Sequence, residues 1–377
     1  MSVTLDGRVE PGFEAVAEAF LANFTDGFEV GASVSVVYEG ETVVDIWAGH
    51  TDETRTAEWQ GDTITNVWSS TKTMMFLVLL ELADKGALSL HDPVHLHWPE
   101  FAANGKESVT VAHLMAHTAG LPGWDRPLRP SDFYDHDLCA GALAEQAPWW
   151  EPGTASGYHA ISQGYLIGEV VRRVTGMSLG TYFRTTFAGP LGADFHIGTP
   201  AECDPRISNV IPPEPLALAG ADPASIAVRT FSNPGMNAAQ SWETGWRRCE
   251  SAAANGHGNA RSLALVQSIV SHGGEAAGHR FISEAGVEKL FEVQAEGTDL
   301  VLGMPAKFGM GYGLNTAHTP ISPNPRACYW GGWGGSLIVN DLDARMTFAY
   351  VMNRMGAGTV GDTRSAGPLM ATYAAIG

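Results

Sequence analysis

One long apolar segment constrains the fold of this chain more than any other feature. Residues 74–82, Met-Met-Phe-Leu-Val-Leu-Leu-Glu-Leu, contain a single charged side chain, Glu81. A helix that is apolar on almost every face must be buried on almost every face. Lys85 and Gly86 follow it as a cationic last turn and a left-handed stop. The sequence therefore predicts a buried central helix.

Ser69 and Lys72 form a Ser-x-x-Lys element where this helix begins. Residues at this spacing share one helix face, so the two side chains are expected to meet. Capping of backbone N–H groups would explain a serine, but not Lys72, because a cation opposes the positive end of the helix dipole and is costly to bury. The chemical interpretation, an activated serine nucleophile, explains both residues. Ser70 and Thr71 fit capping or packing.

Tyr158 is the second candidate, and it follows a Pro-Gly turn in residues 151–160. A tyrosine packed under a loop, with its hydroxyl bonded locally, is the structural alternative. The functional interpretation is a general base. Tyrosine titrates at about 10 in isolation, and an adjacent ammonium group would lower that pKa. Tyr158 could then take the proton of Ser69 and pass it to the leaving group.

The third candidate is the sequence Trp-Gly-Gly-Trp-Gly-Gly-Ser at residues 330–336, on a strand expected late in the chain. Glycines in a strand often mark a close approach by a ligand or by another backbone. Such a strand edge can direct N–H groups at a developing oxyanion. A glycine-rich turn packed by two tryptophans is the structural alternative.

Ser178 lies in Gly-Met-Ser-Leu-Gly (176–180), which fits the Gly-x-Ser-x-Gly pattern of a nucleophile elbow. That motif needs a strand before the serine and a helix after it. The preceding residues instead have the spacing of an amphipathic helix. We therefore expect a turn between two helices and no catalytic role for Ser178.

The secondary-structure pattern predicts an α/β fold. Residues 32–38 and 42–49 are typical of a β-hairpin, and strand character returns at 309–314, 326–330, 336–340 and 346–352. Residues from about 130 to 300 are mostly helical in pattern. These patterns indicate an antiparallel sheet built from N- and C-terminal strands and flanked by helices, with a large, mostly helical insertion. We expect one catalytic domain over 1–377, with an α/β body (about 1–88 and 300–377) and a helical region (about 89–299).

The formal net charge of -19 argues against nucleic acid and anionic membranes as partners. The first residues show neither the basic region nor the apolar core of a signal peptide, and no apolar run reaches membrane-spanning length. We therefore expect a cytoplasmic protein without a nucleic-acid or membrane partner. The sequence carries no signal for an oligomeric state.

The metal-binding residue types do not form a recognised site. The sequence contains no Cys-x-x-Cys and, among 13 histidines, no His-Glu-x-x-His. Widely spaced cysteines suit reduced, mostly buried thiols better than disulfides or a zinc site. These cysteines are Cys139, Cys203, Cys249 and Cys328. We expect neither a metal nor an organic cofactor.

Taken together, Ser69-x-x-Lys72, Tyr158 and the glycine-rich 330–336 strand resemble the serine β-lactamase and penicillin-binding-protein superfamily. Within it the chain looks most like the class C-like branch that includes the family VIII carboxylesterases. The resemblance covers roughly residues 10–375. Further stretches that support it are His117–Leu121, Pro152–Thr154 and Asn255–Arg261.

The resemblance implies roles for matched residues. Ser69 would be the acylated nucleophile, Lys72 its proton-relay partner, and Tyr158 the tyrosine of the second motif. The backbone N–H groups of Ser69 and Trp333 would form the oxyanion hole. The third motif, Lys-Thr-Gly in lactamases, is replaced by a variant seen among family VIII esterases, and its strand would bind substrate through Trp330, Gly331, Gly332 and Trp333.

Two departures from the lactamase pattern favour esters over lactams. Ala160 stands where many lactamases have asparagine, and the uncharged Trp330 replaces the lysine that helps to bind a substrate carboxylate. A lost charge-assisted contact costs about 1.5–3 kcal/mol. We therefore expect a serine carboxylesterase that hydrolyses small neutral esters through an acyl-enzyme, with substrate walls that include residues 124–150.

Three alternatives use the same fold. They are a β-lactamase or D-Ala-D-Ala-type peptidase, an acyltransferase, and a non-catalytic ligand-binding protein. The simultaneous presence of Ser69, Lys72 and Tyr158 argues against the last of these.

Overall fold

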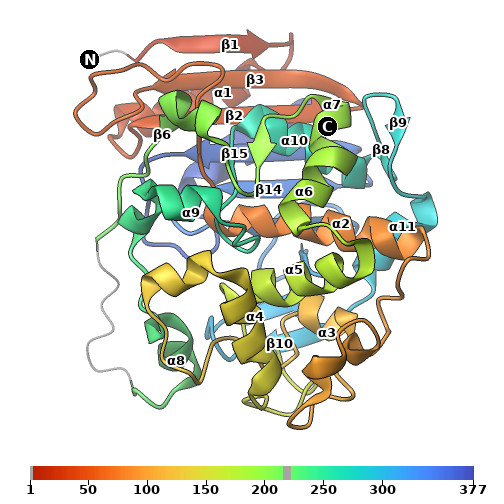
Figure 1. Cartoon of the computed structure of the whole chain (residues 1–377). Coiled ribbons are helices and arrows are strands. Elements are labelled where there is room, and N and C mark those ends of the chain that lie inside the picture. The colour runs from red at the N-terminus through yellow and green to blue at the C-terminus, as the bar shows by residue number, and fades with distance from the viewer. Residues whose placement is uncertain (1–2, 215–221) are drawn as a thin grey trace.

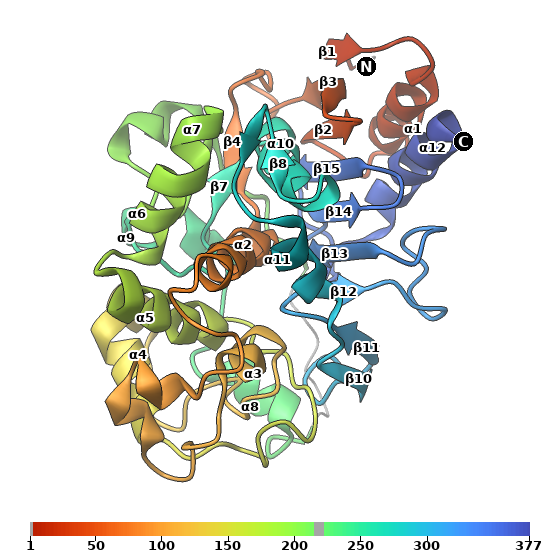
Figure 2. The same cartoon turned by 90° about the vertical axis from the view of Figure 1, so that its right-hand side faces the viewer.

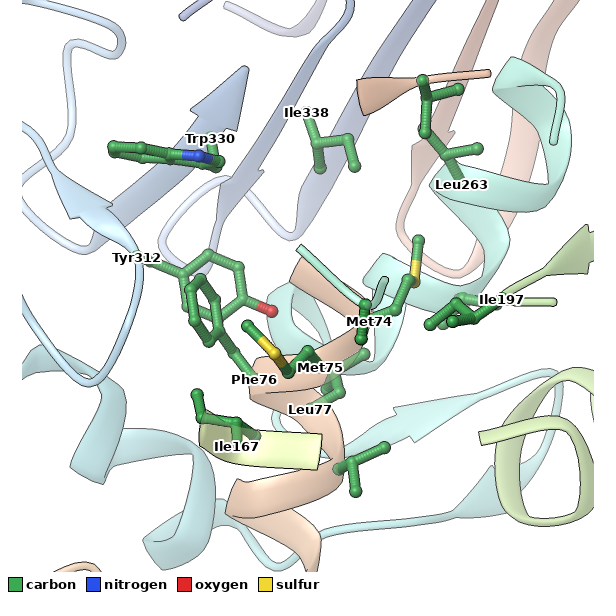
Figure 3. Packing of buried hydrophobic residues seen from close by; sticks show 14 of the residues in the cluster. Met74, Met75, Phe76, Leu77, Ile167, Ile197, Leu263, Tyr312, Trp330 and Ile338 are labelled. Carbon is green, nitrogen blue, oxygen red and sulfur yellow. The ribbon is translucent and has the colours of Figure 1, made fainter. Parts of the chain in front are cut away.

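The apolar segment forms the central helix of the molecule. The computed structural model describes residues 3–214 and 222–377, and in it the helix α2 (Lys72–Asp84) is buried from its first residue to Ala83. Figure 3 shows the start of α2 surrounded by apolar side chains from several other elements, and the ring of Phe76 lies 5.2 Å from that of Tyr312. The predicted buried helix is confirmed.

A nine-stranded antiparallel sheet forms the other half of the core. Within this sheet a strand from the beginning of the chain pairs with a strand from its end. These strands are β2 and β15, whose pairing runs from Ala32↔Met352 to Tyr38↔Met346. The predicted fold class is therefore confirmed. In order across the sheet the strands are β1 (Leu5–Val9), β3 (Glu41–Gly49), β2 (Gly31–Tyr38), β15 (Met346–Met352), β14 (Leu337–Asp341), β13 (Ala327–Gly331), β12 (Gly313–Leu314), β11 (Pro305–Phe308) and β10 (Ala295–Thr298).

Helices cover both faces of the central strands. On one face α1 (Glu14–Thr25) packs against α12 (Ala366–Ile376), and on the other α10 (Ala260–Ser271) packs against β2, β14 and β15 (Figure 2). Strands covered on both faces need apolar residues on both sides, which explains why β2 and β15 are buried along almost their whole length. The site described below lies beyond α10, around α2.

The helices not yet described are α3 (Val111–Met115), α4 (His136–Glu145), α5 (Ser162–Thr175), α6 (Leu179–Phe183), α7 (Gly189–Leu191), α8 (Ile226–Ser232), α9 (Thr244–Arg248) and α11 (Glu284–Glu288). Of these helices, α3, α4, α5 and α8 form the lower half of the molecule in Figure 1, and α7 lies near its top. A four-stranded sheet, which the sequence did not predict, consists of β5 (Phe195–His196), β7 (His257–Gly258), β4 (Ile64–Asn66) and β6 (Ile207–Ser208). Strands of two or three residues are too short to show the alternation of apolar and polar residues by which a strand is predicted.

One predicted strand is mostly absent from the structure. Of the strand expected at 309–314, only Gly313–Leu314 (β12) forms, and the preceding strand β11 ends at Phe308. Gly311 between them has a φ of +93°, and a Cβ at that position would lie 2.5 Å from the ring of Phe76. The chain turns here because α2 approaches its backbone closely.

A short hairpin, β8 (Glu275–Ala276) and β9 (His279–Arg280), follows α10.

All four cysteines are free, and Cys139, Cys203 and Cys328 are buried. Over residues 3–214 and 222–377, no helix combines the length and the apolar character that crossing a membrane requires.

Replacing Leu79 with alanine tests the central role of α2. Leu79 is fully buried, so Leu79→Ala should lower the free energy of unfolding by about 2–5 kcal/mol, measured by urea denaturation. Leu96→Ala is the matched control, because Leu96 is 61% exposed, and it should change the stability by less than about 0.5 kcal/mol. Equal effects of the two substitutions would contradict the placement of α2 in the core.

Candidate active site

A strained turn presents Ser69 at the start of α2. Trp68–Thr71 forms a 3₁₀ turn, η1, directly before Lys72. Trp68 has a φ of +49°, which residues other than glycine rarely adopt, and its buried indole packs against Trp246 and Trp333 at centroid distances of 5.5 and 5.0 Å. Packing of this kind can hold a strained backbone in place.

The side chains of Ser69, Lys72 and Tyr158 meet at one point. The Oγ atom of Ser69 lies 3.2 Å from the Nζ atom of Lys72 and accepts a 2.6 Å hydrogen bond from the hydroxyl of Tyr158. Lys72 is fully buried, and Ser69 and Tyr158 are 7% and 2% exposed. The expected contact between Ser69 and Lys72 is present, although Ser69 belongs to η1 and not to α2 itself.

Lys72 has neutral neighbours. Its Nζ donates to the backbone carbonyls of Ala160 at 2.7 Å and Ala253 at 2.9 Å, and no carboxylate in the described part of the chain forms an ion pair with it. Burial lowers the pKa of Lys72 well below its ordinary value of 10.5. A neutral amine has two N–H groups for the two carbonyls, and its lone pair can then face Ser69.

Tyr158 keeps its proton. Burial raises the pKa of Tyr158 above its ordinary value of 10.0, against the smaller lowering effect of the Ser69 hydrogen bond. The expectation that this pKa is lowered was wrong in direction, because the burial of the phenol itself outweighs the contacts that lower the pKa. Tyr158 is therefore a hydrogen-bond donor to Ser69 in the resting site.

Two supports of Tyr158 were not found from the sequence. The backbone N–H of Tyr158 donates to Oδ1 of the fully buried Asp299 at 3.0 Å, and the ring of His117 packs edge-on against the phenol at 5.0 Å. His117 also accepts a hydrogen bond from the backbone of His159. His117 opens the stretch 117–121 used for the family resemblance, whereas Asp299 is one of 41 acidic residues and carries no local signal.

Two backbone N–H groups are free beside Ser69. Among the described residues, the amides of Ser69 and Trp333 donate to no protein acceptor. The nearby Gly332 has no space for a side chain, since a Cβ there would overlap Ser336 and the Val67 carbonyl and lie 3.3 Å from the Ser69 nitrogen. Gly332 thus permits the strand end to approach Ser69.

The other members of the glycine-rich motif have different positions. Trp330 is 2% exposed and packs against Tyr158 at a centroid distance of 5.4 Å. A Cβ on Gly331 would lie 2.5 Å from the Gly361 nitrogen. Of Trp330, Gly331, Gly332 and Trp333, it is Trp333 that lines the open cavity described next.

An apolar cavity of about 670 Å³ opens above Ser69. Its outer wall comes from residues 212–214 and 231–239, not from the expected 124–150 segment, which packs behind that wall. Trp149 lies under Arg229 of α8 at 3.8 Å, for example. The described residues that line the cavity are Trp68, Ser69, Tyr158, Ala160, Ile161, Pro212, Pro213, Glu214, Phe231, Ser232, Gly235, Met236, Asn237, Ala238, Ala239, Ala254, Trp333 and Thr359.

Ser178 has the structural role that the sequence predicts. It lies in the turn between α5 and α6, where its hydroxyl accepts from the backbone of Thr181 and caps α6. It also donates to Glu250 at 2.8 Å. No strand precedes it, because α5 ends at Thr175.

Among the described residues, Asp194, His196 and Cys203 are close enough to share a metal ion. However, Arg206 donates to Asp194 and to the Cys203 sulfur. The guanidinium occupies the place of a cation beside these groups. The cluster is therefore better described as an arginine-centred polar contact.

This fold, with a buried serine opening into an apolar cavity, is that of the β-lactamase-like serine hydrolases. A family model described as Beta-lactamase matches residues 15–367. The chain therefore belongs to the beta-lactamase family, and the resemblance inferred from the sequence is confirmed.

Individual relatives support this assignment. The chain is 34% identical over 362 residues to the esterase/beta-lactamase LipL of Mycobacterium tuberculosis (strain ATCC 25618 / H37Rv), covering 93% of this chain and 83% of that protein. A family VIII carboxylesterase structure is 39% identical, with a TM-score of 0.93 over 99% of this chain and 100% of that one. A penicillin-binding protein homologue from Caulobacter crescentus is 36% identical, with a TM-score of 0.92 and the same coverage.

Replacing Gly332 with alanine tests the close approach of the strand end to Ser69. The added Cβ should displace the backbone beside the Ser69 amide and slow labelling of Ser69 by a fluorophosphonate at least about tenfold, since small displacements in an active site have large effects on rate. Gly141→Ala is the control, because no atom lies within 4 Å of a Cβ at that position in α4, and it should label at the wild-type rate. Normal labelling of Gly332→Ala would show that the strand end lies elsewhere.

Proposed function

We propose that this protein is a serine carboxylesterase that acts through an acyl-enzyme with Ser69 as nucleophile and Lys72 and Tyr158 as its proton-transfer partners. The observation that carries the proposal is the contact of Ser69 Oγ with both the Lys72 amine and the Tyr158 hydroxyl, beside an apolar cavity. No cofactor takes part in this mechanism.

The geometry supports a defined course for acylation. Ser69 attacks the ester carbonyl while its proton passes to the lone pair of Lys72. The backbone N–H groups of Ser69 and Trp333 stabilise the negative oxygen. Tyr158 then gives its proton to the departing alcohol oxygen, and transfer from the Lys72 ammonium to the phenolate restores both neutral groups.

Deacylation follows the same course with water as the nucleophile. Water attacks the acyl-enzyme, its proton passes to the Lys72–Tyr158 pair, and Ser69 regains a proton as the acid leaves. Because the two groups exchange a proton, their titration belongs to the pair. An alcohol in place of water would give acyl transfer by the same route.

The cavity favours neutral esters over anionic substrates. Glu214 is the one formally charged group among the described residues that line it, and Trp330 replaces a cationic residue of the lactamase motif. The names of the relatives also support an esterase, since they include an esterase/beta-lactamase and a family VIII carboxylesterase. The first of these names favours β-lactam hydrolysis as a second candidate activity.

A cytoplasmic location is part of the proposal. The four free thiols support it, because reducing compartments keep cysteines unpaired.

Ser69→Ala should abolish both fluorophosphonate labelling and hydrolysis of a short p-nitrophenyl ester, because among the described residues Ser69 supplies the one hydroxyl that is hydrogen-bonded to Lys72. Ser178→Ala is the matched control. It should retain most activity and lose about 0.5–2 kcal/mol of stability through the missing helix cap. The opposite pattern would assign the nucleophile to the Gly-x-Ser-x-Gly segment.

The same assay separates the two candidate activities. Wild-type kcat/KM for the p-nitrophenyl ester should exceed that for a chromogenic cephalosporin, because no cationic group among the described lining residues is available to the cephalosporin carboxylate. Faster turnover of the cephalosporin would make the protein a β-lactamase.

The pH dependence should reflect the two proton states. Lys72 must be neutral, so kcat/KM should fall as the pH drops through its lowered pKa, with a midpoint well below 10.5. Tyr158 must be protonated, so a second fall should occur above pH 10, where its pKa is raised. Tyr158→Phe should reduce kcat at least about a hundredfold, with a smaller effect on KM, and should remove the alkaline fall.

Tyr165→Phe is the control for this substitution. Tyr165 is equally buried but donates to the carbonyl of Phe133, so the variant should keep the wild-type kcat and pH profile. An unchanged kcat in Tyr158→Phe would remove Tyr158 from the mechanism.

A further inference from the structure

The turn that carries the Trp333 amide is closed by two backbone hydrogen bonds, from the Gly332 N–H to the Ser336 carbonyl at 2.8 Å and from the Gly335 N–H to the Gly332 carbonyl at 3.2 Å. Gly332, Gly334 and Gly335 surround Trp333, and the φ values of Gly334 and Gly335 are +95° and +130°. Glycine populates many backbone conformations with similar energy. Contacts from outside the turn can therefore help to select one backbone conformation at Trp333, a residue that lines the cavity.

The side chain of Arg364 lies directly against this turn. Its Nη2 donates to the carbonyl oxygen of Gly334, and a Cβ on Gly335 would overlap the same nitrogen. Backbone contacts hold the Gly334 peptide from two further directions, since Gly334 N–H donates to Gly358 at 2.9 Å and its carbonyl accepts from Gly356 at 2.8 Å. Arg364 is the one side chain among the described residues that donates to this carbonyl.

Arg364 is itself fixed on its other sides. Its Nη1 donates to Glu29 at 2.9 Å and to the Arg354 carbonyl at 2.7 Å, and its Nε donates to Asp362. Arg364 is 7% exposed. Burial raises the pKa of Glu29 to about 8, although the positive charge of Arg364 acts in the opposite direction.

This network ends in the central sheet. Tyr350 of β15 donates to the same Glu29 oxygen at 2.6 Å.

A second set of hydrogen bonds connects the turn to the segment that carries Ser69. Ser336 donates to the Val67 carbonyl at 2.8 Å and contacts the Ser70 hydroxyl at 2.9 Å. These hydrogen bonds fix the segments that carry the free amides of Ser69 and Trp333 relative to each other and to the central sheet.

We propose that Arg364 is a positioning residue for the oxyanion hole: by fixing the Gly334 carbonyl it aims the Trp333 N–H at the oxygen that becomes negative during acylation. The inference rests on the proposed function. A planar guanidinium can contact the carbonyl, Asp362 and Glu29 at once with fixed geometry, which a lysine ammonium on a flexible stem cannot do. Displacing one oxyanion donor has a large effect on the chemical step and a small one on binding.

The test compares Arg364→Gln and Arg364→Lys with wild type. Both variants should lower kcat for a p-nitrophenyl ester at least about tenfold with KM within about threefold. Their affinity for a boronic acid, which forms a tetrahedral adduct with serine, should fall in parallel. Arg206→Gln is the matched control, because Arg206 also contacts a carboxylate and a carbonyl but lies outside the turn. It should lower the unfolding temperature and leave the boronate affinity unchanged.

The double variant Glu29→Gln/Arg364→Gln covers the case in which the single variants do not fold. It removes the fully buried carboxylate together with its arginine partner and leaves Asp362, which is 18% exposed, in contact with solvent. It should show the same loss of boronate affinity. Any folded Arg364 variant with wild-type boronate affinity and kcat would overturn the proposal, as would an equal loss in Arg206→Gln.

The two hypotheses fail in different ways. A wild-type protein that hydrolyses no ester would refute the proposed function. The boronate affinities of the Arg364 variants relative to wild type would still decide whether Arg364 positions the Trp333 amide, because the adduct requires Ser69 and the two N–H donors but no turnover.

Discussion

The buried amine of Lys72 lies among carbonyl oxygens, a hydroxyl and an aromatic ring, without a carboxylate in ion-pair distance in the described structure. Burying an ammonium group without a counter-ion is strongly unfavourable, so the fold favours the neutral amine. In that state the amine has a lone pair that can face Ser69. Tyr158 keeps its proton for a second reason, because its own burial raises its pKa.

A few buried contacts also hold the segments that carry these groups. Ser69 is held by a strained turn, Tyr158 by the carboxylate of Asp299, and the Trp333 turn by Arg364. The first support is packing between buried indole rings, and the other two are hydrogen bonds between a side chain and the backbone. The three segments come from distant parts of the chain, and α2 and the sheet bring them together.

Local patterns could be predicted from the sequence, and so could the one long-range feature that repeated strand patterns indicate, a sheet built from both ends of the chain. The buried helix, the 32–38 and 42–49 hairpin, the 346–352 strand and the contact of Ser69 with Lys72 all follow from residue spacing. The direction of the Tyr158 pKa shift was predicted wrongly, because it depends on how deeply the tyrosine itself is buried. The cavity wall at 212–214 and 231–239 and the role of Asp299 likewise depend on which distant segments meet.

The pairing of β2 with β15 has a consequence for biosynthesis. The partner strand of β2 begins at Met346, so the early hairpin of β2 and β3 must wait, while most of the chain is made, with one edge of β2 unpaired. Such an edge is a template for wrong pairing with other chains, and late long-range pairing slows folding. The edge of β2 therefore stays open to wrong pairing until the last strand of the sheet has been made and pairs with it.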